Sequence, residues 1–283
     1  VAEAGSSAAS QIEWLFGFSQ EAFPKFSVRA ELELEQDRIG FAATFILENI
    51  GIEVERSEQS YLDVMLERFG AVFPPTKEFS EYARSTLSDI DPRDDPDGAL
   101  MAWMEREEIL FRTLEKHIVG DWLKSSFTGE VEDFMKASLS IQNRRKSRAG
   151  SALEGHLAKV LTDLGIRFKN PGRTENNAKP DFLFPGQIEY HDAAFPAMSL
   201  TMLGVKTTCK DRWRQVLSEA DRIPAKHLLT LETAISTNQT AEMVAKDLQL
   251  VVPRSLHASY NAAQQKWLFS LRDFTHFVSE KQR

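Results

Sequence analysis

Three polar residues in the second half of the chain have types and positions suited to phosphodiester hydrolysis. Asp181 follows a proline and precedes an apolar run, Lys206 ends another apolar run, and Glu219 lies thirteen residues beyond Lys206. This reaction needs the developing charge on a phosphate to be neutralised and a water to be activated. Mg²⁺ does both, and it prefers oxygen ligands with one or two protein carboxylates. We therefore expect Asp181 and Glu219 to bind Mg²⁺ and Lys206 to orient or help deprotonate the attacking water.

Two further groups extend this candidate site. The carbonyl of Val205 offers a third metal ligand, and Glu154 is a candidate for supporting the ligands or holding a second metal. Taken singly, Asp181 also fits a turn cap and Lys206 a surface charge at a strand end. The apolar runs beside both residues favour a site, because charged groups at the ends of buried strands often belong to one.

A charged triplet, Lys210, Asp211 and Arg212, comes four to six residues after Lys206. Arg and Lys can donate to O6 and N7 of guanine in the major groove, and Asp can accept from N4 of cytosine. The triplet can therefore read consecutive G·C pairs. Without the neighbouring site, the simpler interpretation would be a helix start that Asp211 caps, flanked by solvated basic side chains.

A basic cluster precedes these motifs. Its four members are Arg144, Arg145, Lys146 and Arg148. Such residues are suited to contacting phosphates. A solvated helix entry explains them equally well.

The elements that must position these residues alternate along the second half of the chain. Strands are expected over 181–184, 200–207, 227–231 and 248–252, and helices over 211–220 and 240–247. This alternation predicts an α/β sheet with helices on both sides. Glu219 would then lie on the helix that follows Lys206.

The first 140 residues are expected to be mainly helical. Apolar spacing indicates helices over 60–69, 76–87 and 99–124, with an acidic Pro/Gly-rich linker over 89–98. Glu107 lies on the apolar face of the third helix, where a partly exposed boundary position is the simplest interpretation.

Charge divides the chain in the same way. Residues 1–140 hold 13 Lys or Arg and 28 Asp or Glu, whereas residues 141–283 hold 21 and 14, although the net charge is −8. The basic second half is therefore the part expected to face a polyanion. The single Cys209 excludes an internal disulfide and a multi-Cys zinc site.

The expected cellular location rests on two patterns that the sequence does not contain. No apolar run approaches the ~20 residues of a membrane span, and no signal peptide pattern is visible. We expect a cytoplasmic protein without a membrane partner. The start at Val1 rather than Met indicates trimming.

Four segments of the chain resemble the catalytic domain of the EcoRII family of restriction endonucleases. The longest is VKTTCKDRWRQ at 205–215, and the others cover 143–150, 179–185 and 250–253. The resemblance extends over about 70–283 and is strongest from residue 143. It implies a PD-(D/E)xK fold, with a mixed sheet flanked by helices, in which the last acid has moved onto the following helix.

The resemblance implies a set of roles. Glu154, Asp181, Lys206 and Glu219 would form the active site, with Tyr190 close to it, and Lys210, Asp211 and Arg212 would contact the CC:GG part of a CCWGG-type target. The implied protein is a Mg²⁺-dependent type II enzyme acting on double-stranded DNA, with a cognate DNA methyltransferase in the same system. The palindromic target suggests a homodimer.

The N-terminal region departs from this pattern. The namesake of the family carries an effector DNA-binding domain that restrains its catalytic domain, and residues 1–70 do not resemble it. We therefore divide the chain into an acidic, mainly helical region of unknown role, 1–70, and a catalytic domain, 71–283, with its core at 143–283. A repair or structure-specific nuclease, and a DNA-binding protein that does not cleave, are the alternatives.

Overall fold

The structure is a computed structural model that describes residues 58–126, 131–209, 212–233 and 235–283. The chain divides into two units, residues 1–68 and 69–283. Helix α4 (Glu58–Phe69) ends at this division. None of the helices that the structure describes combines the length and apolar character needed to cross a bilayer.

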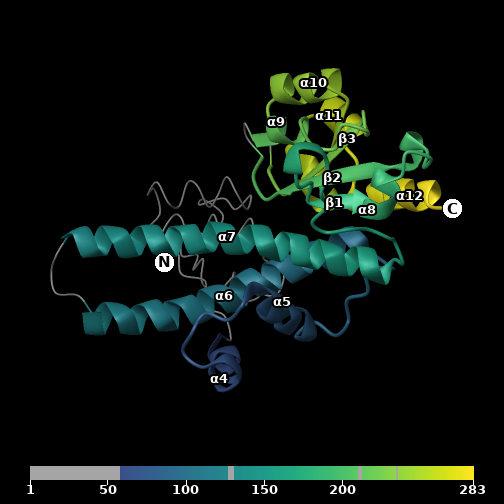
Figure 1. The fold of residues 1–283 in the computed structure, drawn as a ribbon. Coiled ribbons are helices and arrows are strands. Elements are labelled where there is room, and N and C mark those ends of the chain that lie inside the picture. The colour runs from purple at the N-terminus through teal and green to yellow at the C-terminus, as the bar shows by residue number, and fades with distance from the viewer. Residues whose placement is uncertain (1–57, 127–130, 210–211, 234) are drawn as a thin grey trace, which may run out of the picture. The chain divides into compact units, whose positions relative to one another are not determined.

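The second unit begins with three α-helices. These are α5 (Thr76–Ser85), α6 (Pro96–Ser126) and α7 (Val131–Asp163). Helices α6 and α7 run side by side, and α5 packs against both (Figure 1). The turn from Leu161 to Ile166 is a Schellman motif, in which Gly165 at φ 68° allows the N–H of Ile166 to reach the carbonyl of Leu161. Gly165 thus ends the helix as its C-terminal cap.

The expected linker over 89–98 is instead a docked segment. Pro96 opens α6, at a position where its missing N–H costs nothing. The buried carboxylate of Asp97 accepts hydrogen bonds from the backbone N–H groups of Arg254, Leu271 and Arg272. This segment is therefore fixed to the C-terminal part of the unit. Its acidic, Pro/Gly-rich composition, typical of a flexible linker, did not reveal that contact.

Four strands form one mixed sheet in the order β1-β2-β3-β4. Strand β1 (Phe182–Phe184) is antiparallel to β2 (Thr201–Lys206), whereas β3 (Lys226–Thr230) and β4 (Leu248–Val251) continue parallel to β2. All four expected strands are present, with no bound shifted by more than one residue. The α/β fold class predicted from the sequence is confirmed.

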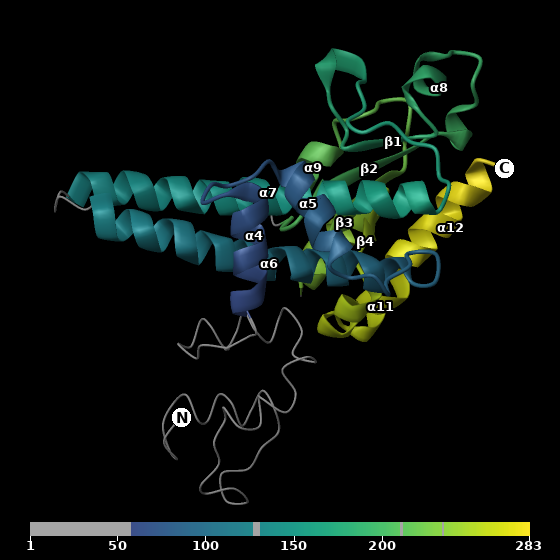
Figure 2. The same ribbon diagram turned by 90° about the horizontal axis from the view of Figure 1, so that it is seen from below.

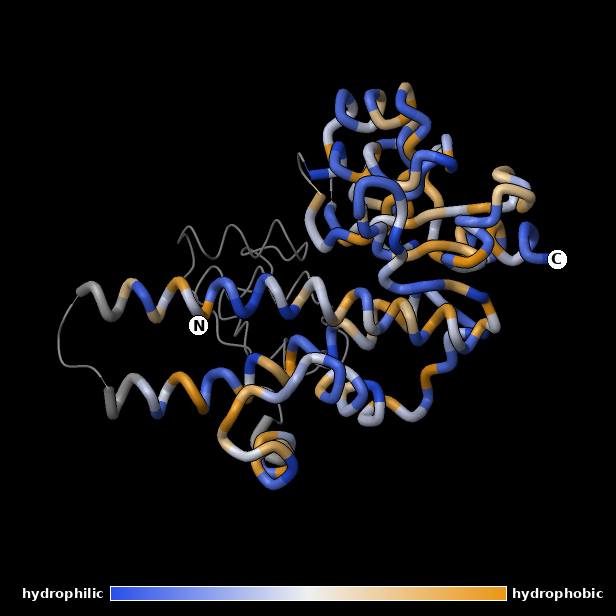
Figure 3. The backbone as a smooth tube through the Cα atoms, in the orientation of Figure 1, coloured by the Kyte–Doolittle hydropathy of each residue, from blue (hydrophilic) through white to orange (hydrophobic). Residues whose placement is uncertain are grey.

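Helices cover both faces of the sheet. Successive strand residues point to opposite sides, so each face presents its own set of side chains to a helical layer. On one face Phe182, Phe184, Leu203 and Val205 pack with the C-terminal half of α7, the start of α6 and α12 (Leu271–Lys281). On the other face Leu183, Met202, Leu228 and Leu250 pack with α9 (Trp213–Val216) and α10 (Thr237–Ala245). Figure 2 shows α7 and α12 from the side opposite to α9, and Figure 3 shows hydrophobic residues along the strands.

Short elements connect these layers. They are η2 (Glu175–Asn177), α8 (Gln187–His191), η3 (Ala197–Ser199), η5 (Arg254–Ser259) and α11 (Ala262–Trp267). The helix expected over 211–220 is reduced to the four residues of α9. Glu219 therefore lies in an irregular segment beyond that helix, not on it.

Candidate active site

Asp181 and Lys206 meet at one end of the β1–β2 pair. Asp181 directly precedes β1 and Lys206 ends β2, so the antiparallel register brings the two together. Oδ2 of Asp181 accepts hydrogen bonds from Nζ of Lys206 at 2.9 Å and from the backbone N–H of Val205 at 2.6 Å. Both side chains are about one-fifth exposed, at 18% and 23%, so solvent and a substrate can reach them.

The charge of Asp181 raises the pKa of two further carboxyl groups. Burial, with Asp181 as the second cause, raises the pKa of Glu219 to about 7. The same two causes raise the pKa of Glu154, which projects from α7. Lys206 acts in the opposite direction on both. The four residues expected to form the site are therefore electrostatically coupled in the fold.

A divalent cation fits this arrangement. The Oε2 atom of Glu219 is buried and has no hydrogen-bond partner, which is costly for a polar atom unless a ligand satisfies it. None of the described His, Cys, Asp and Glu side chains forms a group of three that could hold a metal ion. Mg²⁺ commonly keeps several waters and takes one or two protein carboxylates. Asp181 and Glu219 are the residues that would hold it.

Asn170 is a residue of this site that the sequence did not reveal. Its Nδ2 donates to the carbonyl of Asp181 at 2.7 Å, and its side chain opposes the rise in the pKa of Glu154. It thus links the carboxyl group on α7 to the start of β1. An asparagine in a polar loop carries no spacing signal, so only the fold identifies it.

Tyr190 lies on α8 and is fully buried. Its hydroxyl donates to Oε2 of Glu175 at 2.6 Å and accepts from the backbone N–H of Arg222 at 3.3 Å. Burial and the nearby Glu175 raise its pKa well above the ordinary value. Tyr190 therefore contacts the segment that follows Glu219.

The triplet following Lys206 is described only at its third residue. Lys210 and Asp211 lie outside the described residues. Arg212 is exposed, and its guanidinium donates to the carbonyl of Thr208 at 3.2 Å. Just before the triplet, the N–H of Cys209 donates to Oε2 of Glu232 at 3.0 Å. Arg212 is therefore exposed to solvent while its guanidinium is held by Thr208, and Glu232 holds the backbone at Cys209.

The basic cluster lies in the middle of α7 and not at a helix entry. Arg145 forms an ion pair with Glu115, and the guanidinium of Arg144 lies 4.1 Å from the centre of the Phe73 ring. Lys146 is exposed. The cluster therefore divides between protein contacts and solvent.

Arg148 is buried, which argues against the expected phosphate contact. Its guanidinium pairs with Glu107 and lies 4.2 Å from the ring centres of Phe79 and Phe111. The boundary position expected for Glu107 is also wrong, since that residue is 2% exposed. Neither residue revealed its partner, because they are 41 positions apart in the sequence.

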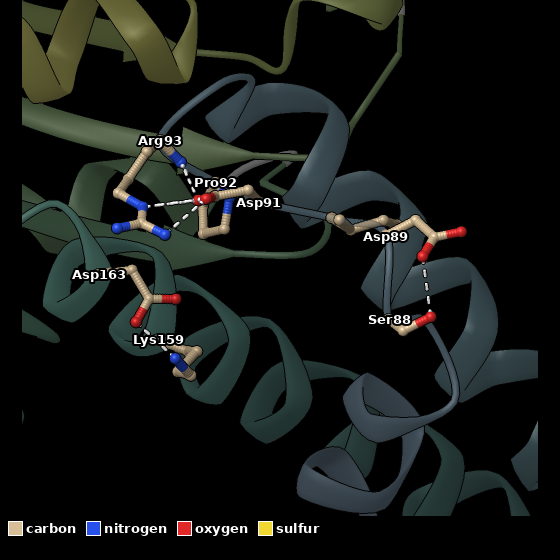
Figure 4. A pocket seen from close by; sticks show the side chains of 8 residues that line it. Ser88, Asp89, Asp91, Pro92, Arg93, Lys159 and Asp163 are labelled. Carbon is tan, nitrogen blue, oxygen red and sulfur yellow. Dashed lines mark hydrogen bonds and ion pairs between the residues drawn. The ribbon is translucent and has the colours of Figure 1, made fainter.

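A pocket of about 480 Å³ lies apart from the predicted site residues, between the α5–α6 connection and α7 (Figure 4). Its polar groups pair largely with one another. Arg93 contacts Asp91, Lys159 contacts Asp163, and Ser88 contacts Asp89. We assign it no role in the candidate site.

Comparison with known proteins agrees with this arrangement. The family model described as "EcoRII C terminal" matches residues 111–275. The type II restriction enzyme EcoRII of Escherichia coli is 40% identical over 225 residues, which are 79% of this chain and 55% of that enzyme. The chain thus spans about half the length of this curated relative.

Solved structures share the fold. A metal-depleted Ecl18kI bound to uncleaved, modified DNA has a TM-score of 0.62 at 16% identity, covering 80% of this chain and 85% of that one. A complex of the restriction endonuclease PspGI with substrate DNA has a TM-score of 0.62 at 18% identity, covering 74% and 93%. The fold is therefore that of these restriction endonuclease structures. With the family match over more than half of its length, the chain belongs to the family of the EcoRII C-terminal domain.

Proposed function

We propose that this chain is a type II restriction endonuclease that hydrolyses double-stranded DNA at a CCWGG-like site with Mg²⁺. The observation that carries the proposal is the contact of Asp181 and Lys206 at neighbouring strand ends, with Glu154 and Glu219 coupled to them. The relative named as a type II restriction enzyme supports the same class of activity.

Each residue has a distinct task in this proposal. Asp181 and Glu219 would hold Mg²⁺, which would neutralise phosphate charge and activate water. Lys206, whose ammonium already lies beside Asp181, orients the attacking water and donates to the phosphate. Glu154, linked to the start of β1 through Asn170, supports these groups from α7. The expected product carries a 5′-phosphate.

Recognition is assigned to the loop after β2. Arg212, together with Lys210 and Asp211, would read the outer G·C pairs, because their donors and acceptors match base edges in the major groove. Exposed Lys146 is a candidate phosphate contact, as are Arg144 and Arg145 if DNA competes with their present partners.

The palindromic site leads us to propose a homodimer in which each subunit cuts one strand. Such an activity belongs in the cytoplasm, where a cognate methyltransferase would protect the host's own sites. Residues 1–70 remain assigned to a separate region of unknown role.

The test is cleavage of a plasmid that carries CCWGG sites, in Mg²⁺, beside a plasmid without them. The wild type should give discrete fragments from the first plasmid alone. Asp181→Ala should lower the rate by at least about 100-fold, because it removes a metal ligand and the acceptor of Lys206. Asp163→Ala is the matched control, since Asp163 pairs with Lys159 near the pocket of Figure 4 and not with a proposed site residue.

Other outcomes distinguish the alternatives. Degradation of both plasmids would indicate a repair or structure-specific nuclease. Specific binding of the target duplex without any cleavage in Mg²⁺ would indicate a DNA-binding protein. Equal activity of Asp181→Ala and the wild type would exclude the proposed site.

A further inference from the structure

The segment directly after Glu219 is held by side chains from distant parts of the chain. Three consecutive backbone N–H groups each donate to a side-chain oxygen. The pairs are Ala220 with Thr174 Oγ1 at 3.4 Å, Asp221 with Glu175 Oε2 at 3.3 Å, and Arg222 with Tyr190 Oη at 3.3 Å. The Tyr190 hydroxyl also donates to Glu175, which joins two of the acceptors to each other. The backbone is thus fixed without regular secondary structure.

The side chain of Arg222 adds a second set of contacts. Its guanidinium donates to three backbone carbonyls on α8 and the loop after it, which belong to Tyr190, Asp192 and Phe195. The guanidinium has five N–H donors in a rigid plane, so one residue can bind several carbonyls at once. Arg222 therefore fastens the segment to a separate part of the unit.

The buried ammonium of Lys226 closes the segment from the sheet side. It donates to the carbonyls of Ala220 at 2.7 Å and Ile223 at 2.6 Å. Ala220 itself has φ 52°, a left-handed conformation that is unfavourable for a non-glycine residue. Such a conformation persists where surrounding contacts determine it. Here it sets the direction in which the chain leaves Glu219.

This arrangement matters because the site residues differ in how they are supported. Asp181 and Lys206 adjoin paired strands, and Glu154 lies on a long helix. Glu219 instead follows the four residues of α9, where regular structure has ended. A metal ligand must be held closely to bind well. The Oε2 atom of Glu219 is buried without a partner, so its position depends on the segment behind it.

We infer that Glu175, Tyr190 and Arg222 are positioning residues that hold Glu219 in place as a metal ligand. This inference rests on the proposed function, which supplies the metal. It gives Tyr190, which the resemblance placed close to the active site, a supporting role, and it assigns roles to Glu175 and Arg222. The three residues act through backbone contacts and do not touch the substrate.

Two conservative variants test this assignment. Tyr190→Phe removes only the hydroxyl between Glu175 and the N–H of Arg222, and Arg222→Lys removes the fork that binds three carbonyls. Arg272→Lys is the matched control, because Arg272 binds a carbonyl and a carboxylate near α12. Glu219→Ala identifies the metal binding that belongs to the site.

Mn²⁺ binding to each full-length protein is measured by loss of the free-ion electron paramagnetic resonance signal. The Mg²⁺ dependence of plasmid cleavage, duplex binding in EDTA and the melting temperature are measured in parallel. Tyr190→Phe and Arg222→Lys should each weaken the Glu219-dependent Mn²⁺ binding by about tenfold or more. The Mg²⁺ concentration for half-maximal cleavage should rise by a similar factor. Both variants should bind the duplex in EDTA as tightly as the wild type. The Arg272→Lys protein should match the wild type in every measurement.

The outcomes separate the two proposals. Unchanged Mn²⁺ affinity and Mg²⁺ dependence in both variants, with active wild type, would overturn the positioning role. A fall in the maximal rate at unchanged metal dependence would overturn it as well, since a general structural role predicts that result. If the wild type cleaves no DNA but the variants lose Mn²⁺ affinity, the proposed function fails and the positioning role stands.

Discussion

At the scale of single residues, burial decides what each charged group can do. Glu219 is half-buried with an unpartnered oxygen, which suits a ligand, whereas Arg148 is buried with its partner and serves packing. Arg212 is exposed at the end of the motif VKTTCKDR, where a donor can reach a base. Residue type alone does not separate these three cases.

Arg212→Ala should lower discrimination at the outer G·C pairs of the target. Losing a bidentate contact to guanine costs about 1–3 kcal/mol, or roughly 5- to 150-fold in relative affinity. Duplexes with and without the outer G·C pairs, compared by binding in EDTA, give this ratio. Arg214→Ala is the control, because its guanidinium pairs with Glu242. Equal weakening on both duplexes would make Arg212 a phosphate contact.

The buried imidazole of His227 should make stability depend on pH. Burial, and next the charge of Lys281, lowers its pKa from 6.5 to about 4. The unfolded chain therefore binds a proton more readily between these values, so stability is lost as the pH falls below 6.5. The contribution is about 2 kcal/mol between pH 7 and 5.

Urea unfolding at a series of pH values measures this effect. The free energy of unfolding should fall less steeply with acid in His227→Gln than in the wild type. Some dependence will remain, because burial also lowers the pKa of His156. Parallel pH profiles for the two proteins would show that His227 does not cause the pH dependence of stability.

At the scale of elements, α7 serves both the site and the helical layer. Its C-terminal half packs on the sheet and carries Glu154, while Arg148 and His156 point to Glu107 on α6. Burial raises the pKa of Glu107, but His156 and Arg148 more than offset this and leave it below its ordinary value. The carboxylate is thus kept charged between the two helices.

Glu107→Ala should destabilise the protein by about 3–5 kcal/mol. The substitution leaves Arg148 buried without its carboxylate, and an uncompensated buried charge is strongly unfavourable. Glu108, the residue after Glu107, forms a half-exposed ion pair with Arg112. Glu108→Ala should therefore lower the free energy of unfolding by less than about 1 kcal/mol. Urea unfolding compares the two. Equal losses of unfolding free energy in the two variants would mean that the buried pair stabilises the protein no more than the half-exposed one.

At the scale of the whole molecule, charge and site coincide. The acidic first 140 residues contrast with the basic remainder, and all four proposed active-site residues lie in the basic part. A positively charged region raises the rate at which a polyanion meets the site. The net charge of −8 conceals this division.

The proposed homodimer should have twice the 32.1 kDa mass of the chain when measured by light scattering after gel filtration. If each subunit cuts one strand, mixing wild type with excess Asp181→Ala should favour heterodimers with one active site. Nicked circles should then accumulate from a CCWGG plasmid. A monomer that still makes double-strand breaks in a single binding event would contradict the dimer.

Local sequence patterns determined much of the fold and the chemical types of the site. Short apolar runs bounded by a proline or a charged residue predicted all four strands, because strand formation and burial depend on neighbouring residues. The same runs located Asp181 and Lys206. The helix expected around Glu219 was too long, since α9 ends after four residues where the N–H groups beyond Glu219 turn to side-chain acceptors.

Only the tertiary structure decided which polar groups meet. Arg222 finds Tyr190 across 32 positions, Asp221 finds Glu175 across 46, and Asp97 binds Leu271 across 174. A side-chain contact of this kind depends on how helices and strands pack, and it leaves no periodic signal along the chain. The sequence thus determined the elements and the residue types of the proposed site, whereas packing determined the contacts around Glu219.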